Sequence, residues 1–164
     1  EAFGEYGMEK KKIEEALTKT NINYKIIRPS YIVGEGDHIG RLSYYISKLN
    51  NKEPIEISGD GNYPINIVFV QDVVKCLLSV IGDNRRTYKS YYICGDESIT
   101  INKLISLFKK ELNVKNHTIT DSDESLFYNQ SFEFNNSDIK EDYNLNFTDL
   151  KVCLKQYIEE YNEY

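Results

Sequence analysis

The chain has 164 residues, of which 40% are hydrophobic and 28% charged, and its formal net charge is −6. This composition is typical of one soluble globular domain that is long enough to bury a core. The longest apolar stretch, residues 65–70, is far too short to span a bilayer, which argues against a membrane protein. The sequence has no long run of lysine or arginine to replace phosphate counterions, so nucleic acid is not an expected partner.

The cysteines and the first residues both predict a cytoplasmic protein. Cys76, Cys94 and Cys153 lie far apart and are odd in number, which argues against a disulfide framework. Residues 1–5 are acidic, whereas a secretory signal would begin with basic residues. We therefore expect a reducing, cytoplasmic setting.

Taken in chain order, the apolar residues alternate between helical and extended spacing. Tyr6, Lys10, Ile13 and Leu17 recur three or four positions apart and would share one face of a helix. A β-branched run follows and ends at Pro29, which is typical of a strand. Helices are predicted at residues 3–20, 39–50, 72–81, 136–143 and near 101–112 and 149–158, and strands at 24–28, 31–33, 54–57, 65–70 and 91–95, with two short strands near 117–120 and 132–134.

Residues that cap helices predict where three of these helices begin. Asp72 is expected to cap the helix that ends at Ile81, either Ser98 or Thr100 the following helix, and Thr148 the last one. Four apolar residues of the helix 72–81 are predicted to be buried: Val73, Val74, Leu77 and Leu78.

Helices that alternate with short apolar strands predict an α/β fold with layered elements. The helix–strand–helix order at the start indicates part of a doubly wound sheet. Residues 37–70 are more typical of a small cap region beside that sheet. Neither His38 nor His117 has a cysteine or an acidic partner at ligand spacing, so no metal site is expected.

Tyr6 and Lys10 are the candidate chemical pair. A spacing of four residues on a helix brings the phenol and the ammonium group side by side. A nearby cation stabilises the phenolate form of a tyrosine. Such a tyrosine can exchange a proton with a substrate hydroxyl or carbonyl while a hydride moves to or from nicotinamide. The spacing alone does not mark a site, because Tyr44 and Lys48 repeat it.

The strand after the first pair distinguishes it from the second. One helix downstream of Tyr6 the chain reads Arg-Pro-Ser-Tyr-Ile-Val-Gly over residues 28–34, and the Tyr44–Lys48 pair has no such sequel. Four further segments match in order: PIEISGDG at 54–61, VFVQDVV at 68–74, YICGDESIT at 92–100, and the spaced residues Asp138, Leu145, Phe147, Leu150, Leu154 and Tyr157. Together these segments resemble the C-terminal portion of an extended short-chain dehydrogenase/reductase, the NAD(P)-dependent epimerase/dehydratase family.

The resemblance implies roles by position. Tyr6 would be the catalytic acid/base, and Lys10 would hold the nicotinamide ribose. Five consecutive residues would line the nicotinamide pocket: Pro29, Ser30, Tyr31, Ile32 and Val33. The cofactor would be NAD or NADP, and the substrate a sugar-like or other small molecule with a hydroxyl or carbonyl group.

The resemblance also implies how the chain is divided. Residues 1–36 would be the tail of the dinucleotide-binding domain, with the Tyr-x-x-x-Lys helix and the following strand. Residues 37–164 would form mainly the substrate-binding region, with residues near 72–95 returning to the Rossmann sheet. The fold class is therefore predicted as α/β, the C-terminal part of a Rossmann-like doubly wound sheet plus a small substrate-binding cap.

Three features depart from the family's pattern. Gly34 and Gly36 lack the third glycine and the helix start of a pyrophosphate-binding loop. The family's catalytic serine or threonine would precede Glu1. Ile65 and Asn66 stand where sugar-nucleotide enzymes of the family carry an Arg–Asp pair whose arginine holds the diphosphate. We therefore expect these residues alone to bind cofactor weakly or not at all, and the third departure argues against a nucleotide-sugar substrate.

Two classes of function stay open. The parent protein would be an NAD(P)-dependent epimerase, dehydratase or reductase, of which this chain is an inactive fragment. Alternatively, it would be a catalytically silent relative that senses a cofactor or associates with RNA as a regulator. Because the family often pairs through its Tyr-x-x-x-Lys helix, residues 1–20 are also a candidate homodimer interface.

Overall fold

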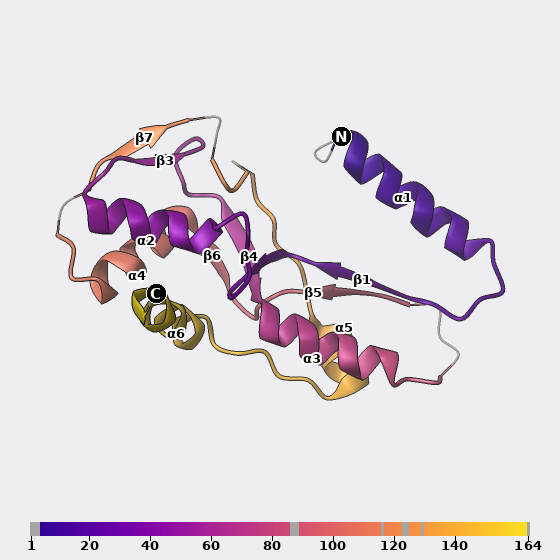
Figure 1. Cartoon of the computed structure of the whole chain (residues 1–164). Helices are drawn as coiled ribbons and strands as arrows, with labels where there is room; N and C mark the ends of the chain where they lie inside the picture. Colours follow the sequence, from indigo (N-terminus) through magenta and orange to yellow (C-terminus); the bar gives the residue numbers. More distant parts are fainter. Residues whose placement is uncertain (1–3, 86–88, 116, 123–124, 129, 164) are drawn as a thin grey trace.

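The structure, a computed structural model, describes residues 4–85, 89–115, 117–122, 125–128 and 130–163 (Figure 1). Its helices are α1 (Gly4–Thr18), α2 (Arg41–Asn51), α3 (Val70–Ile81), α4 (Ile101–Glu111), α5 (Ser137–Tyr143) and α6 (Leu150–Glu163). Its strands are β1 (Lys25–Pro29), β2 (Tyr31–Val33), β3 (Ile55–Ile57), β4 (Pro64–Phe69), β5 (Lys89–Ile93), β6 (Ser98–Thr100) and β7 (Ile119–Asp121). None of the helices in these ranges is both long and apolar enough to cross a membrane.

Parallel strand pairs confirm the predicted α/β class. Strand β1 pairs with β5, β2 with β4, and β3 with β7, each in parallel, while β6 adds to β4 in antiparallel. The predicted strand near 117–120 is β7, and the one near 132–134 is a bridge from Phe132 to Ile65. Strand β6 was not predicted. Residue 3 of the predicted first helix lies outside the described residues.

The chain changes strand partner between β1 and β2. Only Ser30 separates the two strands, and its N–H donates to the carbonyl of Ile93 at 2.9 Å. The next residue, Tyr31, is already in register with Ile67 of β4. The carboxyl end of β1 therefore lies at the junction of two parallel ladders, a common location for ligand sites in open α/β sheets.

Two apolar cores hold the elements together. The larger joins α2, α4 and α6 to β4, and it includes Leu42, Tyr45, Ile46, Ile65, Leu104, Ile105, Phe108 and Leu154. The smaller lies between α3, α5 and β5 and consists of Val68, Val73, Cys76, Tyr91, Ile93 and Ile139. The expected cap of α4 is confirmed at Thr100, whose Oγ1 accepts from the N–H of Lys103 at 3.2 Å.

The predicted caps of α3 and α6 are both wrong, for one reason. Helix α3 begins at Val70, so Asp72 lies inside its first turn. The buried carboxylate of Asp72 accepts from the N–H of Thr148 at 2.9 Å and from its hydroxyl at 3.1 Å. Thr148 is therefore engaged with α3, and Asp149 Oδ1 accepts from the N–H groups of Lys151 and Val152 at the start of α6. Asp72 and Thr148, 76 residues apart, thus bind each other instead of capping α3 and α6.

The buried face of α3 is also different from the predicted one. Val73 is buried as predicted, but Val74, Leu77 and Leu78 are 47%, 38% and 67% exposed. The face toward the core carries Asp72, Val73 and Cys76. Helical spacing identifies an apolar stripe, but it does not determine which side of the stripe meets the sheet, and here the buried side is the one that carries Asp72.

We expect Asp72→Ala to destabilise the protein by about 2 kcal/mol, because it leaves the part-buried N–H of Thr148 without its acceptor and removes the ion pair with Lys75. Urea unfolding, extrapolated linearly to water, measures this change in the free energy of unfolding. Glu159→Ala is the matched control: it removes an exposed carboxylate that pairs with Lys155 at 3.8 Å on α6, and should cost less than about 0.5 kcal/mol. Equal stability of the Asp72→Ala protein and wild type would contradict the assigned contact.

Candidate active site

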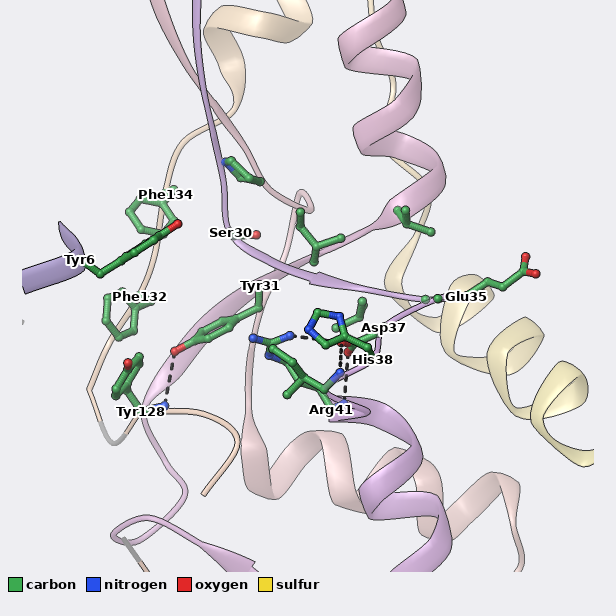
Figure 2. Close-up of a pocket in the computed structure, with 17 residues that line it drawn as sticks. Tyr6, Ser30, Tyr31, Glu35, Asp37, His38, Arg41, Tyr128, Phe132 and Phe134 are labelled. Atoms are coloured by element: carbon green, nitrogen blue, oxygen red, sulfur yellow. Dashed lines mark hydrogen bonds and ion pairs between the residues drawn. The ribbon is translucent and has the colours of Figure 1, made fainter. Parts of the chain in front are cut away.

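A cavity of about 550 Å³ opens where β1 passes into β2. The loop at residues 34–39, the first residue of α2 and aromatic residues of the segment 128–134 complete its wall. Tyr6 of α1 reaches the cavity from the opposite side, and Figure 2 shows its ring directed toward Phe132 and Phe134. The volume lies within the range usual for small-molecule sites.

The structure brings most of the sequence-predicted site residues to this one cavity. Its wall includes Tyr6 together with all five residues of the predicted nicotinamide segment: Pro29, Ser30, Tyr31, Ile32 and Val33. Lys10 is the exception, because it does not line the cavity. Its Nζ lies 5.2 Å from the centroid of the Tyr6 ring, so the expected neighbourhood of phenol and ammonium is present. The chemical roles of these residues remain predictions.

An ion pair connects α1, and hence Tyr6, to the sheet. None of the described residues of α1 is buried. Arg28 Nε donates to Glu14 Oε1 at 2.9 Å, and Nη2 donates to Glu14 Oε2. Arg28 Nη1 also donates to Ser90 Oγ on β5 at 3.3 Å. Because this arginine begins the Arg-Pro segment of the family motif, one residue joins the helix of the candidate acid/base to the strands beneath the cavity.

The second Tyr-x-x-x-Lys pair has a structural role. Lys48 Nζ lies 5.7 Å from the centroid of the Tyr44 ring, a geometry close to that of the first pair. The Tyr44 hydroxyl, however, accepts from the N–H of Glu56 at 3.0 Å, and Lys48 donates to Glu53 at 2.9 Å. Neither Tyr44 nor Lys48 lines the cavity. These contacts tie α2 to β3.

Sequence reasoning missed the polar residues at the start of α2. Arg41 lines the cavity, with Nη1 3.4 Å from Asp37 Oδ1 and its guanidinium carbon 5.6 Å from the centroid of the Tyr31 ring. Asp37 Oδ1 and Oδ2 accept from the N–H groups of Ile39 and Arg41, each at 3.1 Å. The spacing of four between Asp37 and Arg41, just before a helix, is a signal that could have identified the pair.

An aromatic wall comes largely from a segment in which weak periodicity predicts only a short strand near residues 132–134. The rings of Tyr31 and Phe127 meet edge to face at 4.9 Å between centroids, and Phe132 lies 6.0 Å from Tyr31. The Tyr31 hydroxyl accepts from the N–H of Tyr128 at 3.3 Å, and burial raises its pKa above the usual 10. The raised pKa disfavours the phenolate form of Tyr31, whose ring forms part of the cavity wall.

Ile65 and Asn66 act in the scaffold rather than in the cavity. Ile65 is fully buried in the larger core. Asn66 Oδ1 accepts from the N–H of Phe134 at 2.7 Å, and its Nδ2 donates to the carbonyls of Gly95 and Glu97 at 3.4 and 3.3 Å. These bonds hold the aromatic segment against β4, so Asn66 contributes to the position of the cavity wall.

The residues present fit the nicotinamide end of a dinucleotide. Pro29, Ile32 and Val33 give the cavity an apolar wall, and Ser30 Oγ is buried there without a hydrogen-bond partner among the described residues. A carboxamide, with two donors and an acceptor, suits such a hydroxyl. Gly34 and Gly36 do not fit the pyrophosphate, because their loop reaches α2 only through turns at Asp37 and Gly40.

Residues 2–94 match the sequence model of the "NAD dependent epimerase/dehydratase family". The chain belongs to this family. One relative is the Methanocaldococcus jannaschii protein named "Putative UDP-glucose 4-epimerase", 31% identical over 125 residues, which are 71% of this chain and 40% of the relative. Another is the chloroplast stem-loop binding protein of 41 kDa b from Arabidopsis thaliana, 24% identical over 91 residues, 56% of this chain and 24% of the relative.

Solved structures show the same fold. The Thermotoga maritima UDP-glucose 4-epimerase with UDP-glucose has a TM-score of 0.78 and 22% identity, over 96% of this chain and 53% of that chain. The Bacillus anthracis dTDP-glucose 4,6-dehydratase with NAD has a TM-score of 0.78 and 15% identity, over 92% of this chain and 48% of that chain. The predicted fold class, part of a Rossmann-like sheet with a cap region, is confirmed. The chain spans about half the length of these proteins.

We expect Glu14→Gln to loosen α1, because it removes the charge that pairs with Arg28. The hydrogen bond from Arg28 holds the pKa of Glu14 below its usual 4.5. The ion pair therefore contributes fully above about pH 4.5, and its contribution is lost as the pH falls through the lowered pKa. The pair is partly exposed, so the effect should be about 1 kcal/mol or less, or up to roughly fivefold faster hydrogen exchange of α1 amides.

Hydrogen exchange followed by mass spectrometry at pH 7 measures this effect. Glu9→Gln, an exposed glutamate on the same helix, is the control and should leave exchange unchanged. If the two variants exchange alike, the Glu14–Arg28 pair does not hold the helix.

Proposed function

We propose that the protein containing this chain is an NAD(P)-dependent enzyme that epimerises, dehydrates or reduces a sugar-like or other small hydroxyl or carbonyl compound. The observation that carries the proposal is the meeting of Tyr6 and the Pro29–Val33 segment in one cavity, although they belong to separate elements. Family membership supports it. The three cysteines are free and buried, which supports a reducing cytoplasm.

In this proposal Tyr6 moves a proton at its phenol oxygen. The phenol would give a proton to a substrate carbonyl oxygen, or take one from a hydroxyl, according to the direction of reaction. Lys10, beside the ring, would stabilise the phenolate and hold ribose hydroxyls. The rings of Tyr31, Phe132 and Phe134 would exclude water from the reacting atoms. The nicotinamide, when bound, accepts or gives the hydride.

The 164 residues alone are proposed to be nearly inactive. They contain no G-x-x-G-x-x-G sequence, and the loop with Gly34 and Gly36 does not fit a pyrophosphate. Residues 1–36 would belong to the nucleotide-binding domain and residues 37–164 mainly to the substrate region. The parallel pairing of β5 with β1 supports the return of residues near 72–95 to the first sheet. Activity is therefore expected of a protein as long as the family's relatives.

A second candidate function has one observation in its favour. The Arabidopsis relative is named as a stem-loop binding protein, so a catalytically silent regulator that associates with RNA or senses a cofactor is the alternative. The net charge of −6 opposes direct binding to a polyanion.

Tyr6→Phe in the full-length protein separates the two. An enzyme should lose about 10²–10⁴-fold in turnover and keep its cofactor affinity, because only the proton-transferring oxygen is removed. A cofactor sensor or RNA-associated regulator would bind its ligands unchanged. The matched control is Tyr44→Phe, which removes the same atom from the second Tyr-x-x-x-Lys pair and should keep turnover within about twofold. Activity is measured with NAD(H) and NADP(H) against a panel of nucleotide sugars and free sugars. Equal turnover of the Tyr6→Phe protein and wild type would reject the catalytic role of Tyr6, and no turnover by wild type would reject the enzyme.

We also propose a homodimer through α1. Met8 and Ile13, which do not line the cavity, expose large apolar side chains on this helix. Ile13→Glu should convert a dimer of the full-length protein to a monomer in sedimentation velocity, whereas Lys12→Glu beside it should not. A wild-type monomer at about 100 μM, far above the Kd of a typical stable dimer, would refute the interface.

A further inference from the structure

The cavity contains a cation that the proposed chemistry does not use. Among the described residues lining it, Arg41 is the one arginine or lysine. Its side chain is 19% exposed, and its Nε is buried without a hydrogen-bond partner among the described residues. A guanidinium has five N–H donors, and the bond from Nη1 to Asp37, at 3.4 Å, is long. The protein thus leaves much of this donor set unused beside an open cavity.

The surroundings hold Arg41 in place without neutralising its donors. Asp37 accepts from two backbone N–H groups and one edge of the guanidinium, so this carboxylate orients Arg41 rather than covering it. Tyr31 supports the guanidinium with its ring face, 5.6 Å from centroid to carbon. Figure 2 shows the carboxylate of Glu35 directed away from Arg41, toward the far side of the loop.

Ile65, which belongs to the scaffold, leaves Arg41 as the cation of the cavity among the residues that the structure describes. The cavity receives no cation from that position, because Ile65 is buried in the larger core. Arg41 comes instead from the first turn of α2, where the positive end of the helix also favours an anion. Arg41 therefore combines a positive charge, a fixed orientation, an N–H donor without a partner among the described residues and a position in the cavity wall.

We propose that Arg41 binds an oxyanion of the substrate, a carboxylate or a phosphate. This inference rests on the proposed function in that the anion is part of the substrate. The planar guanidinium recognises both groups through paired N–H donors, so the ligand class is an acidic sugar or a sugar carrying phosphate. Arg41 selects the substrate, while Tyr6 moves the proton.

Isothermal titration calorimetry on the full-length protein tests the proposal with UDP, inorganic phosphate and glucuronate at fixed ionic strength. Arg41→Gln should weaken binding of the recognised anion by about tenfold or more, because charge-assisted bonds are lost. Arg41→Lys keeps the charge but not the planar pair of donors, so it should weaken binding by roughly threefold or more. Lys48→Gln, which removes one positive charge from the same helix, should change affinity less than about twofold.

The two sources of the anion are distinguished by which probe Arg41→Gln affects. Loss confined to UDP and phosphate identifies a phosphate ligand, and loss confined to glucuronate identifies a sugar acid. Wild-type affinity in a folded Arg41→Gln protein would overturn the proposal, as would equal loss in Lys48→Gln or no binding of any probe to wild type. If Arg41→Gln does not fold, as judged by its thermal midpoint, Arg41→Lys decides with the same criteria.

The outcome is independent of the Tyr6 test. Anion binding lost in Arg41→Gln while Tyr6→Phe keeps full turnover would support the anion site and reject the catalytic role of Tyr6. Turnover lost in Tyr6→Phe while Arg41→Gln binds the probes normally would support the catalytic role of Tyr6 and reject the anion site at Arg41.

Discussion

The change of strand partner between residues 25 and 33 is the constraint on which the site depends. Strand β1 pairs with β5 and β2 pairs with β4, with only Ser30 between them. Pro29 has no N–H to continue a ladder, and the N–H of Ser30 closes the first one on Ile93. Because two ladders diverge here, the backbone cannot fill the space between them, and side chains from distant segments form the wall of the cavity.

Those distant segments are held by bonds that local sequence does not reveal. Asn66 binds the N–H of Phe134, 68 residues away, and thereby fixes the aromatic segment on β4. Asp72 binds Thr148 and thereby fixes the start of α6 on α3. Both polar side chains are buried, and each accepts a hydrogen bond from a backbone N–H of a distant segment. These segments thus depend on a few satisfied polar contacts as well as on the apolar cores.

This dependence explains what the sequence could and could not predict. The amphipathic face of α4, with Leu104, Ile105 and Phe108, follows from a period of 3.6 residues and was predicted correctly. The buried face of α3 was not: it carries Asp72, whose partner Thr148 lies 76 residues away and cannot be inferred from spacing within the helix. Likewise, Tyr6 and the Pro29–Val33 segment were recognised through motif order, whereas Arg41 belongs to no motif and required the cavity to be seen.

The two Tyr-x-x-x-Lys pairs have similar local geometry but different surroundings. Both place a lysine ammonium within 6 Å of a tyrosine ring, since the α-helix alone dictates that distance. They differ in what lies beyond the helix: the Tyr44 hydroxyl is taken by the backbone of β3, while Tyr6 faces a cavity. Arg28 supplies the link, because it joins α1 to the strand that continues into the cavity wall. The Arg-Pro segment therefore carries information that the Tyr–Lys spacing lacks: it specifies which tyrosine is brought to the junction of the two ladders.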